Sequence, residues 1–179
     1  MKLDKFTVKA QEALQDAQSI ARRRDHQEIL PEHVLAALLA QQDGLVAPIL
    51  QRIGADPSLV QARLEDELRK VAQVHGGEGG HLAQRTLKVL DAAEDEAQKL
   101  KDEYVSTEHI LLALASEKRG GAGEALRASG ATRDRIAQAL TRCAARSGSP
   151  RRIPSRSTGP WRSTRSISPT APARASWTR

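Results

Sequence analysis

A gapless internal repeat constrains the fold of this 179-residue chain more than any other feature of its sequence. Aligning Leu30 with Ser106 places LPEHVLAALLAQQDG (30–44) over STEHILLALASEKRG (106–120). Thirteen positions then match: Leu14/Leu90, Ala17/Ala93, Ala21/Ala97, Glu32/Glu108, His33/His109, Leu35/Leu111, Ala37/Ala113, Leu38/Leu114, Gly44/Gly120, Leu50/Leu126, Gly54/Gly130, Ala55/Ala131 and Leu64/Leu140. We therefore expect two packed copies of one unit, at about 4–75 and about 82–145. The glycine-rich segment HGGEGGH (75–81) would join them as a flexible linker.

Apolar residues recur in each copy at the spacing of an α-helix. In the first predicted helix they are Ala10, Ala13, Leu14, Ala17, Ile20 and Ala21, which share one face. Small alanine side chains on this face allow helices to approach closely. Aromatic residues make up only 2% of the chain, which disfavours strands.

Capping residues divide each copy into four helices. The second helix begins at Pro31, which suits a first helical turn, and Ser106 is the predicted N-cap of its counterpart. The third helix spans about 48–53 and stops at Gly54, and the fourth has Asp56 as its N-cap. We predict an all-α body of eight helices, in which a pseudo-twofold axis relates two four-helix halves.

The net charge of +6 is confined to the end of the chain. Residues 1–146 hold 21 Lys and Arg against 22 Asp and Glu, whereas 147–179 hold seven Arg and no other charged residue. The same C-terminal segment also contains eight Ser and five Pro. This change of composition marks a boundary between a domain at 1–145 and a disordered tail at 146–179. Taken alone, the tail's arginines could contact nucleic acid.

The motifs of several enzyme classes are missing from the sequence. No Lys is followed by Ser or Thr, so there is no phosphate-binding loop, and no glycine-rich turn follows a predicted strand. A single cysteine, Cys143, excludes an internal disulfide and a cysteine-rich zinc site. The apolar runs 34–40 and 110–115 are too short to span a membrane, and the N-terminal sequence lacks a signal peptide. We expect no catalytic residue, cofactor or metal, no membrane attachment, and a cytoplasmic location.

Histidines and glutamates recur at two positions of the repeat. His33 and His109 suit a packed first-turn histidine better than a ligand-binding one. Glu32 and Glu108 stand in the first turn of a predicted helix, where the helix dipole favours a carboxylate, and an exposed Glu108 could also meet a partner. His75 and His81 flank the linker, and two histidines without further ligands make a weak metal site beside the alternative of solvated residues.

The repeat and its motifs resemble the N-terminal domain of the Clp family of AAA+ unfoldases. MKLDKFTVKAQEALQDAQSIA looks like the opening helix of that domain in ClpB-type disaggregases, and the two EH-containing segments look like its two "EHLLLALL" segments. The resemblance covers about 1–145 and implies a mobile accessory domain on a hexameric ring. It further implies binding of unfolded or aggregated polypeptides and of adaptor proteins, with the DnaK chaperone system acting alongside the ring.

The resemblance also implies which residues contact substrate. Family members use an apolar groove with polar residues nearby, and the matching positions here are Thr7, Leu90, Glu108 and His109. His109 is polar where some relatives are apolar. The chain carries no ATPase motif, so it would bind substrate without threading it.

The sequence offers three alternative functions. The internal repeat favours a substrate-binding module that is detached from its ATPase. An active ATPase component would need a phosphate-binding loop, which the sequence lacks, and a nucleic-acid-binding protein is supported by the tail alone.

The tail has a further interpretation. Read one frame away, codons for about 141–179 can encode a segment resembling the one that follows the N-domain in ClpB; Ser176 to Arg179 as AGC TGG ACC CG contain Leu-Asp-Pro. We expect a truncated gene product with a frameshifted tail.

Overall fold

Each predicted helical segment forms a helix in the computed structural model, which describes residues 3–42, 44–74 and 80–146. A short 3-10 helix at Leu3–Lys5 precedes α1. The remaining elements, in chain order, are α1 (Val8–Arg23), β1 (Glu28–Ile29), α2 (Pro31–Ala40), α3 (Val46–Arg52), α4 (Pro57–Arg69), β2 (His81–Leu82), α5 (Gln84–Lys99), α6 (Thr107–Ser116), α7 (Gly121–Ala128) and α8 (Arg133–Arg146). The all-α prediction of eight helices in two related halves is confirmed for the described residues.

Helix boundaries follow the capping residues. Asp56 caps α4, and its side chain accepts a hydrogen bond from the Ser58 N–H at 2.9 Å. Gly54 follows α3 with φ +76° and Gly130 follows α7 with φ +81°, so both matched helices end at a left-handed glycine. The third helix starts at Val46, two residues before the predicted start at 48. The linker residues 75–79 and the tail 147–179 lie outside the described residues.

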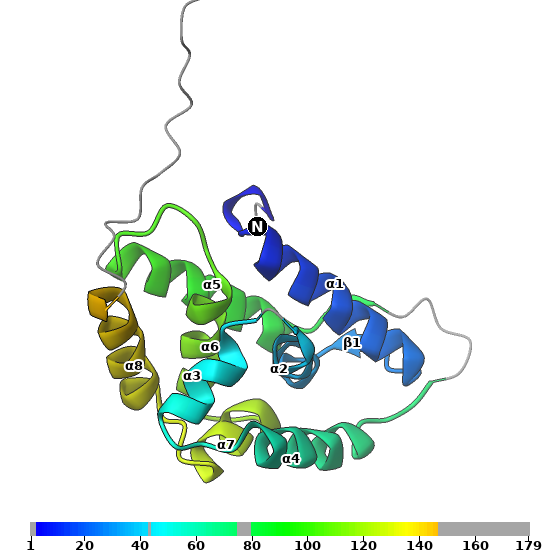
Figure 1. Ribbon diagram of the computed structural model, residues 1–179. Helices are drawn as coiled ribbons and strands as arrows, with labels where there is room; N and C mark the ends of the chain where they lie inside the picture. Colours follow the sequence, from blue (N-terminus) through cyan, green and yellow to red (C-terminus); the bar gives the residue numbers. More distant parts are fainter. Residues whose placement is uncertain (1–2, 43, 75–79, 147–179) are drawn as a thin grey trace, which may run out of the picture. The chain divides into compact units, whose positions relative to one another are not determined.

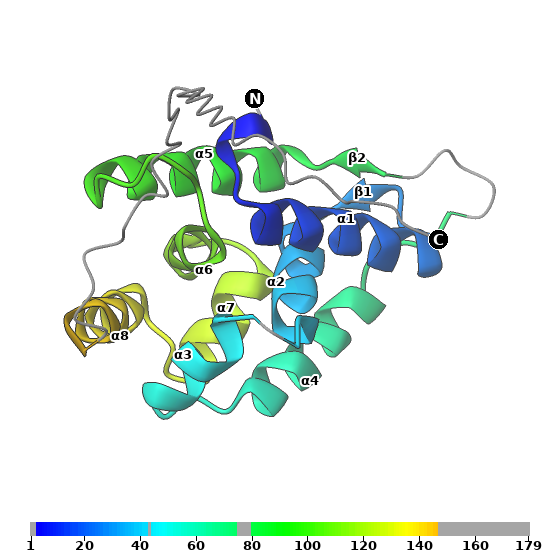
Figure 2. The same ribbon diagram turned by 45° about the horizontal axis from the view of Figure 1, so that its top comes forward.

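Two short parallel strand pairs link the two halves, and each pair takes one strand from each half. Ile29, just before α2, pairs in parallel with Leu82, just before α5, and Figure 2 shows β1 beside β2. At the matched positions, Phe6 before α1 forms a parallel bridge with Val105 before α6. The start of each half is therefore held by the other half, so the pseudo-twofold axis is built into the backbone hydrogen bonds.

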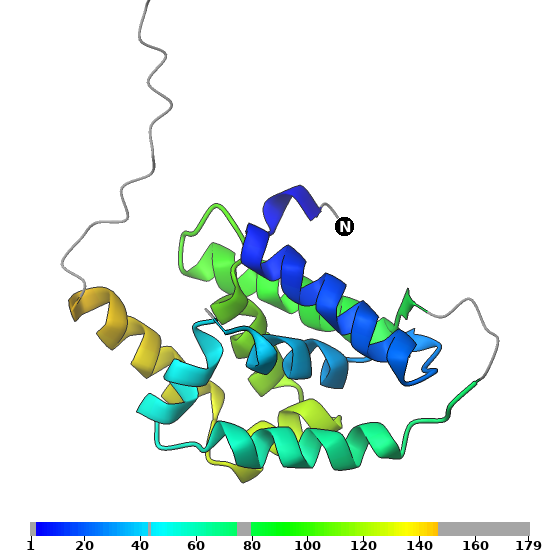
Figure 3. The same ribbon diagram turned by 45° about the vertical axis from the view of Figure 1, so that its right-hand side comes forward.

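Two apolar helices form the centre of this unit. α1 packs against α2 and α5 packs against α6, while α4 packs against α7 across the halves (Figures 1 and 3). Leu35 and Leu38 of α2 and their matches Leu111 and Leu114 of α6 are all fully buried. Burying a leucine side chain stabilises the fold by about 1.5–3 kcal/mol. Small residues on α1, such as Ala13 and Ala17, are also fully buried and let α1 lie close to α2.

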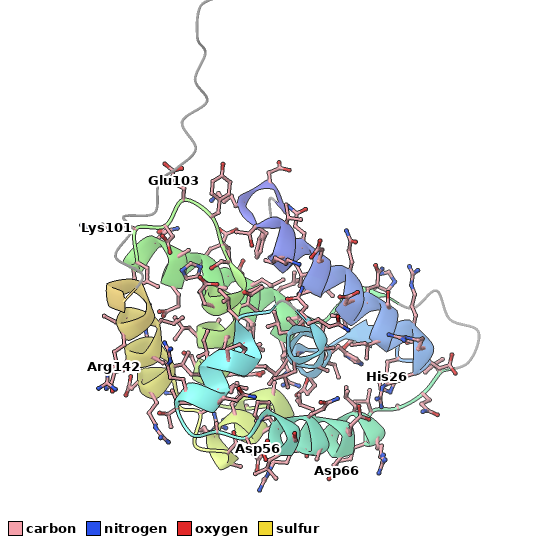
Figure 4. The ribbon with its side chains drawn as sticks, in the orientation of Figure 1. His26, Asp56, Asp66, Lys101, Glu103 and Arg142 are labelled. Atoms are coloured by element: carbon pink, nitrogen blue, oxygen red, sulfur yellow. The ribbon has the colours of Figure 1, made fainter. Side chains whose placement is uncertain are left out.

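Matched positions lie far apart in the folded unit. Figure 4 shows His26 at the end of α1 and Lys101 in the loop after α5, on the opposite side. Lys101 is the repeat counterpart of Asp25, and the two residues adopt a left-handed backbone, with φ +57° and +54°. The same turn therefore follows the first helix of each half.

Candidate functional site

The four residues predicted to bind substrate come from α1, α5 and α6. Thr7 is the N-cap of α1, where its Oγ1 accepts a hydrogen bond from the Ala10 N–H at 3.3 Å. The Thr7 N–H donates to the Val105 carbonyl at 2.9 Å, just before α6 begins. Thr7 therefore lies close to the first turn of α6, which carries Glu108 and His109.

Burial separates these four residues. Leu90 and His109 are 0% exposed, so in this conformation neither reaches a bound chain. Glu108 is only 7% exposed, which corrects the expectation of an exposed carboxylate, and Thr107 Oγ1 lies 3.4 Å from its Oε2. Both α1 and α5 pack against α6. Binding of substrate by the four residues stays a prediction.

His109 is a packed first-turn histidine, as predicted. Its Nδ1 accepts a hydrogen bond from the Ser106 N–H at 3.0 Å, so the neutral ring carries its proton on Nε2. Nε2 lies 3.2 Å from Oδ2 of Asp102. The ring therefore connects the N-terminus of α6 to the loop that precedes it.

His33 makes the same contacts with a different partner. Its Nδ1 accepts from the Leu30 N–H at 3.0 Å, and its Nε2 lies 2.8 Å from Nδ1 of His26. His26 occupies the repeat position of Asp102, because these two residues precede His33 and His109 by the same interval. His26 was not predicted as a site residue, although its place before a repeated histidine was the available signal.

Burial governs the protonation of this histidine pair. His33 is 0% exposed, and burial together with the neighbouring His26 lowers its pKa to about 4. Burial, with Arg24 next in effect, also lowers the pKa of His26. Both rings are therefore neutral near pH 7, and the pair is a structural contact.

Glu32 joins the two halves. Its Oε1 accepts hydrogen bonds from Nη2 of Arg85 at 2.8 Å and from the Gly121 N–H at 2.8 Å, at the start of α7. Glu32 stands in the first turn of α2, as predicted, and it also caps α7 in the other half. The sequence offers no local signal for this contact, because the partners lie 53 and 89 residues away.

Arg85 also holds a second carboxylate. Its Nε and Nη2 donate to Oε1 of Glu117 at 3.0 and 2.8 Å. The Oε2 atoms of Glu32 and Glu117 are buried with no hydrogen-bond partner among the described residues. Burial raises the pKa of Glu117, although the hydrogen bonds from Arg85 act in the opposite direction. One guanidinium thus serves two carboxylates.

The described residues contain no group of three or more His, Cys, Asp or Glu that could hold a metal ion. His75 and the side chain of Cys143 lie outside the described part of the chain, and His81 pairs through its backbone with Glu28 in the small sheet. No helix of that part is long and apolar enough to cross a membrane.

Residues 5–129 match the Clp repeat (R) N-terminal domain family. The chaperone protein ClpB of Porphyromonas gingivalis is 36% identical over 140 residues, covering 78% of this chain and 16% of that protein. ClpB of Nitratidesulfovibrio vulgaris is 44% identical over 121 residues, covering 65% of this chain and 14% of that protein. The chain thus spans about a sixth of the length of these relatives.

Solved structures show the same fold. The Hsp104 N-terminal domain from Candida albicans matches with a TM-score of 0.66 and 25% identity, covering 75% of this chain and 89% of that one. A structure described as a peptide from the SciI protein of the EAEC Sci1 T6SS matches with a TM-score of 0.64 and 26% identity, covering 78% and 91%. The match over most of the two repeats, together with these relatives, establishes that the chain belongs to the Clp repeat N-terminal domain family.

Proposed function

We propose that residues 1–145 form the substrate- or adaptor-binding N-terminal module of a ClpB-type disaggregase. The observation that carries this proposal is the family match over 5–129, which includes the first repeat, most of the second, and the strand pairs between them. The curated relatives are named as ClpB chaperones, and one solved relative is named for a peptide. The proposed ligands are unfolded or aggregated polypeptides and adaptor proteins in the cytoplasm.

The module is proposed to bind without hydrolysing ATP, because the sequence holds no phosphate-binding loop. In a whole disaggregase the ring of ATPase domains, a hexamer working with the DnaK system, would supply that activity. A small module should bind weakly, since association first costs an estimated 4–15 kcal/mol in lost freedom.

Thr7 and Glu108 are the two predicted site residues that are not fully buried. Thr7 is half-buried at the start of α1, and the Glu108 carboxylate lies in the first turn of α6. The proposed roles of Leu90 and His109 are indirect: they hold α5 and the start of α6 in place. Substitutions at these two buried positions would disturb folding and binding together.

The test measures binding of a fluorescently labelled, permanently unfolded protein by anisotropy. Thr7→Ala and Glu108→Gln should each weaken binding several-fold. Thr7→Ser keeps the capping oxygen and Glu103→Gln alters an exposed carboxylate, so these controls should bind like the parent. Thermal melts monitored by circular dichroism report whether each variant is folded.

Two outcomes would contradict the proposal. The parent chain binding no unfolded protein at any concentration tested would remove the binding function. ATP turnover above background in a purified preparation would show that the chain is an enzyme. If the parent, Thr7→Ala and Glu108→Gln bound equally well, the binding function would stand, but the binding site would lie elsewhere on the module.

A further inference from the structure

A surface hollow lies between α5 and the C-terminal end of α6. It measures about 460 Å³, and Val89, Ala92 and Ala113 contribute apolar surface to it. The small side chains at 92 and 113 leave space that larger residues would fill. The hollow therefore offers room for one or two side chains of a bound peptide.

Positive charge surrounds this hollow. Four of its lining residues are cationic, and Glu117 is its one carboxylate. Arg85 is held by Glu32 and Glu117, whereas Lys88, Lys118 and Arg119 have no carboxylate within ion-pair distance among the described residues. All three are exposed. Their charge is available to a ligand.

A second hollow lies at the matched place in the first half, between α1 and the end of α2. It measures about 390 Å³ and is lined by Lys9, Glu12 and Asp16, with Gln15, Ala40, Gln41 and Gln42. All of these residues except Gln15 are repeat counterparts of lining residues of the first hollow, which carries Lys88 in place of Glu12. Lys9 forms an ion pair with Glu12 at 3.4 Å. The two hollows therefore occupy matched places in the fold, but the charged residues that line them give opposite net charges.

The difference in charge between the two hollows shows that two of the cations are not required for folding. Because the first half builds a similar hollow with Glu12 and Gln42 at the matched positions, the fold does not need Lys88 or Lys118 there. An apolar floor with uncompensated cations at its edge complements a segment that joins carboxylates to an aliphatic side chain. Nucleic acid fits less well, since no aromatic side chain lines the hollow for a base to stack on.

We propose that the hollow between α5 and α6 binds an acidic peptide segment, with an aliphatic side chain on the floor and carboxylates beside Lys88, Lys118 and Arg119. This inference rests on the proposed function, because it names the chemistry of the polypeptide that the module takes. It also assigns the acidic-peptide site to the second half of the repeat alone.

The test compares labelled 12-residue peptides of one pattern whose polar positions are all Glu, all Gln or all Lys. Anisotropy is measured with the full chain at fixed ionic strength. The Glu peptide should bind at least about tenfold more tightly than the Lys peptide, and added salt should weaken it. Replacing its leucines with serines should also weaken binding.

Charge-reversal variants locate the site. Lys88→Glu/Arg119→Glu should weaken the Glu peptide at least about tenfold. The control Arg22→Glu/Arg63→Glu makes the same change of net charge at exposed residues of α1 and α4, away from the hollow, and should have little effect. Because both variants retain the seven arginines of 147–179, the tail cannot produce a difference between them.

Each alternative result overturns the inference in its own way. Equal weakening by both double variants would show non-specific attraction, to the tail or to the surface as a whole. A single-stranded oligonucleotide that competes for the parent but not for Lys88→Glu/Arg119→Glu would show a nucleic-acid site. Failure of the Glu peptide to bind, while the unfolded protein still binds, would refute this inference and leave the proposed function standing, whereas failure of both to bind would refute both.

Discussion

The two halves of the repeat place a histidine at the same point and give its Nε2 atom a different neighbour. In the first half, Nε2 of His33 meets the His26 ring at 2.8 Å, with both rings buried. In the second, Nε2 of His109 lies 3.2 Å from the partly exposed carboxylate of Asp102. In both, Nδ1 accepts the N–H of the residue that precedes the helix.

The comparison shows which features the fold requires and which differ between the halves. The first-turn histidine, the glycine after the third helix and the strand pair are common to both halves and hold the backbone. The histidine's partner, the charge of the surface hollow and the carboxylate cluster at Arg85 differ. The features that differ between the halves are candidates for function, because the backbone arrangement common to both halves forms without them.

The largest difference between matched positions is expected at Leu14 and Leu90. Leu90 is 0% exposed whereas Leu14 is half-buried at the edge of the core. Leu90→Ala should lower the free energy of unfolding by about 2–5 kcal/mol, and Leu14→Ala by less, because less buried volume is removed. Urea denaturation measures both. Equal losses would mean that the halves are packed equally at this position.

Acid should destabilise the first half through its histidine pair. The pKa of His33 is lowered from 6.5 to about 4 in the fold, so between these pH values the unfolded chain binds a proton that the folded chain excludes. Stability is therefore present above pH 6.5 and is lost as pH falls toward 4, by up to about 3 kcal/mol.

His26→Asn provides the test of that pH dependence. Asn keeps an acceptor near the position of Nδ1 but removes the second titrating ring, so the loss of stability between pH 6.5 and 4 should become smaller. The free energy of unfolding in urea is measured at several pH values. Exposed His81→Asn is the control and should keep the parent's pH dependence. An unchanged slope in His26→Asn would contradict the role of the pair.

Arg85 and Lys9 are matched positions with unequal partners. Arg85 serves the buried Glu32 and the partly buried Glu117, whereas Lys9 pairs on the surface with Glu12. Arg85→Gln should cost about 1–3 kcal/mol, because it leaves two carboxylates without their charged donor. Lys9→Gln should change stability by less than about 0.5 kcal/mol. Equal effects in chemical denaturation would show that the carboxylate cluster does not connect the halves.

The smallest effect is expected from removing residues 147–179. If this tail is a frameshifted sequence with no role in the fold, the shortened chain should unfold within about 0.5 kcal/mol of the parent. Resequencing across the codons for Ala139 to Arg142 tests the origin of the tail. A shifted frame that meets an early stop, or that does not continue into an ATPase with a phosphate loop, would contradict the frameshift.

Most of the fold could be predicted from the sequence because its signals are local. Pro31, Asp56 and Gly54 mark helix ends through their own backbone preferences, and the internal repeat transfers each conclusion to the other half. The exchanged pairs at Phe6 and Ile29 were not predicted, because strands of one or two residues show no alternation of polar and apolar residues.

The candidate site was less predictable. The family resemblance matched Leu90 and His109 to groove residues by their positions along the chain. Such a match does not predict whether a side chain is exposed, and both residues are fully buried. The contacts of Glu32 with Arg85 and α7 arise only when the halves meet. The charge contrast of the two hollows was already present in the sequence, yet it became visible only when the structure showed which side chains share a hollow.

The most direct test of this account is an NMR titration of the ¹⁵N-labelled chain with the acidic peptide. The two matched halves share one backbone arrangement, and the second half is proposed to carry the binding surface. Amide shifts should change most at residues 85–92 and 113–119, and remain small at the matched positions of the first half, 9–16 and 37–43. Equal changes at both sets of positions, or none at saturating peptide, would contradict it.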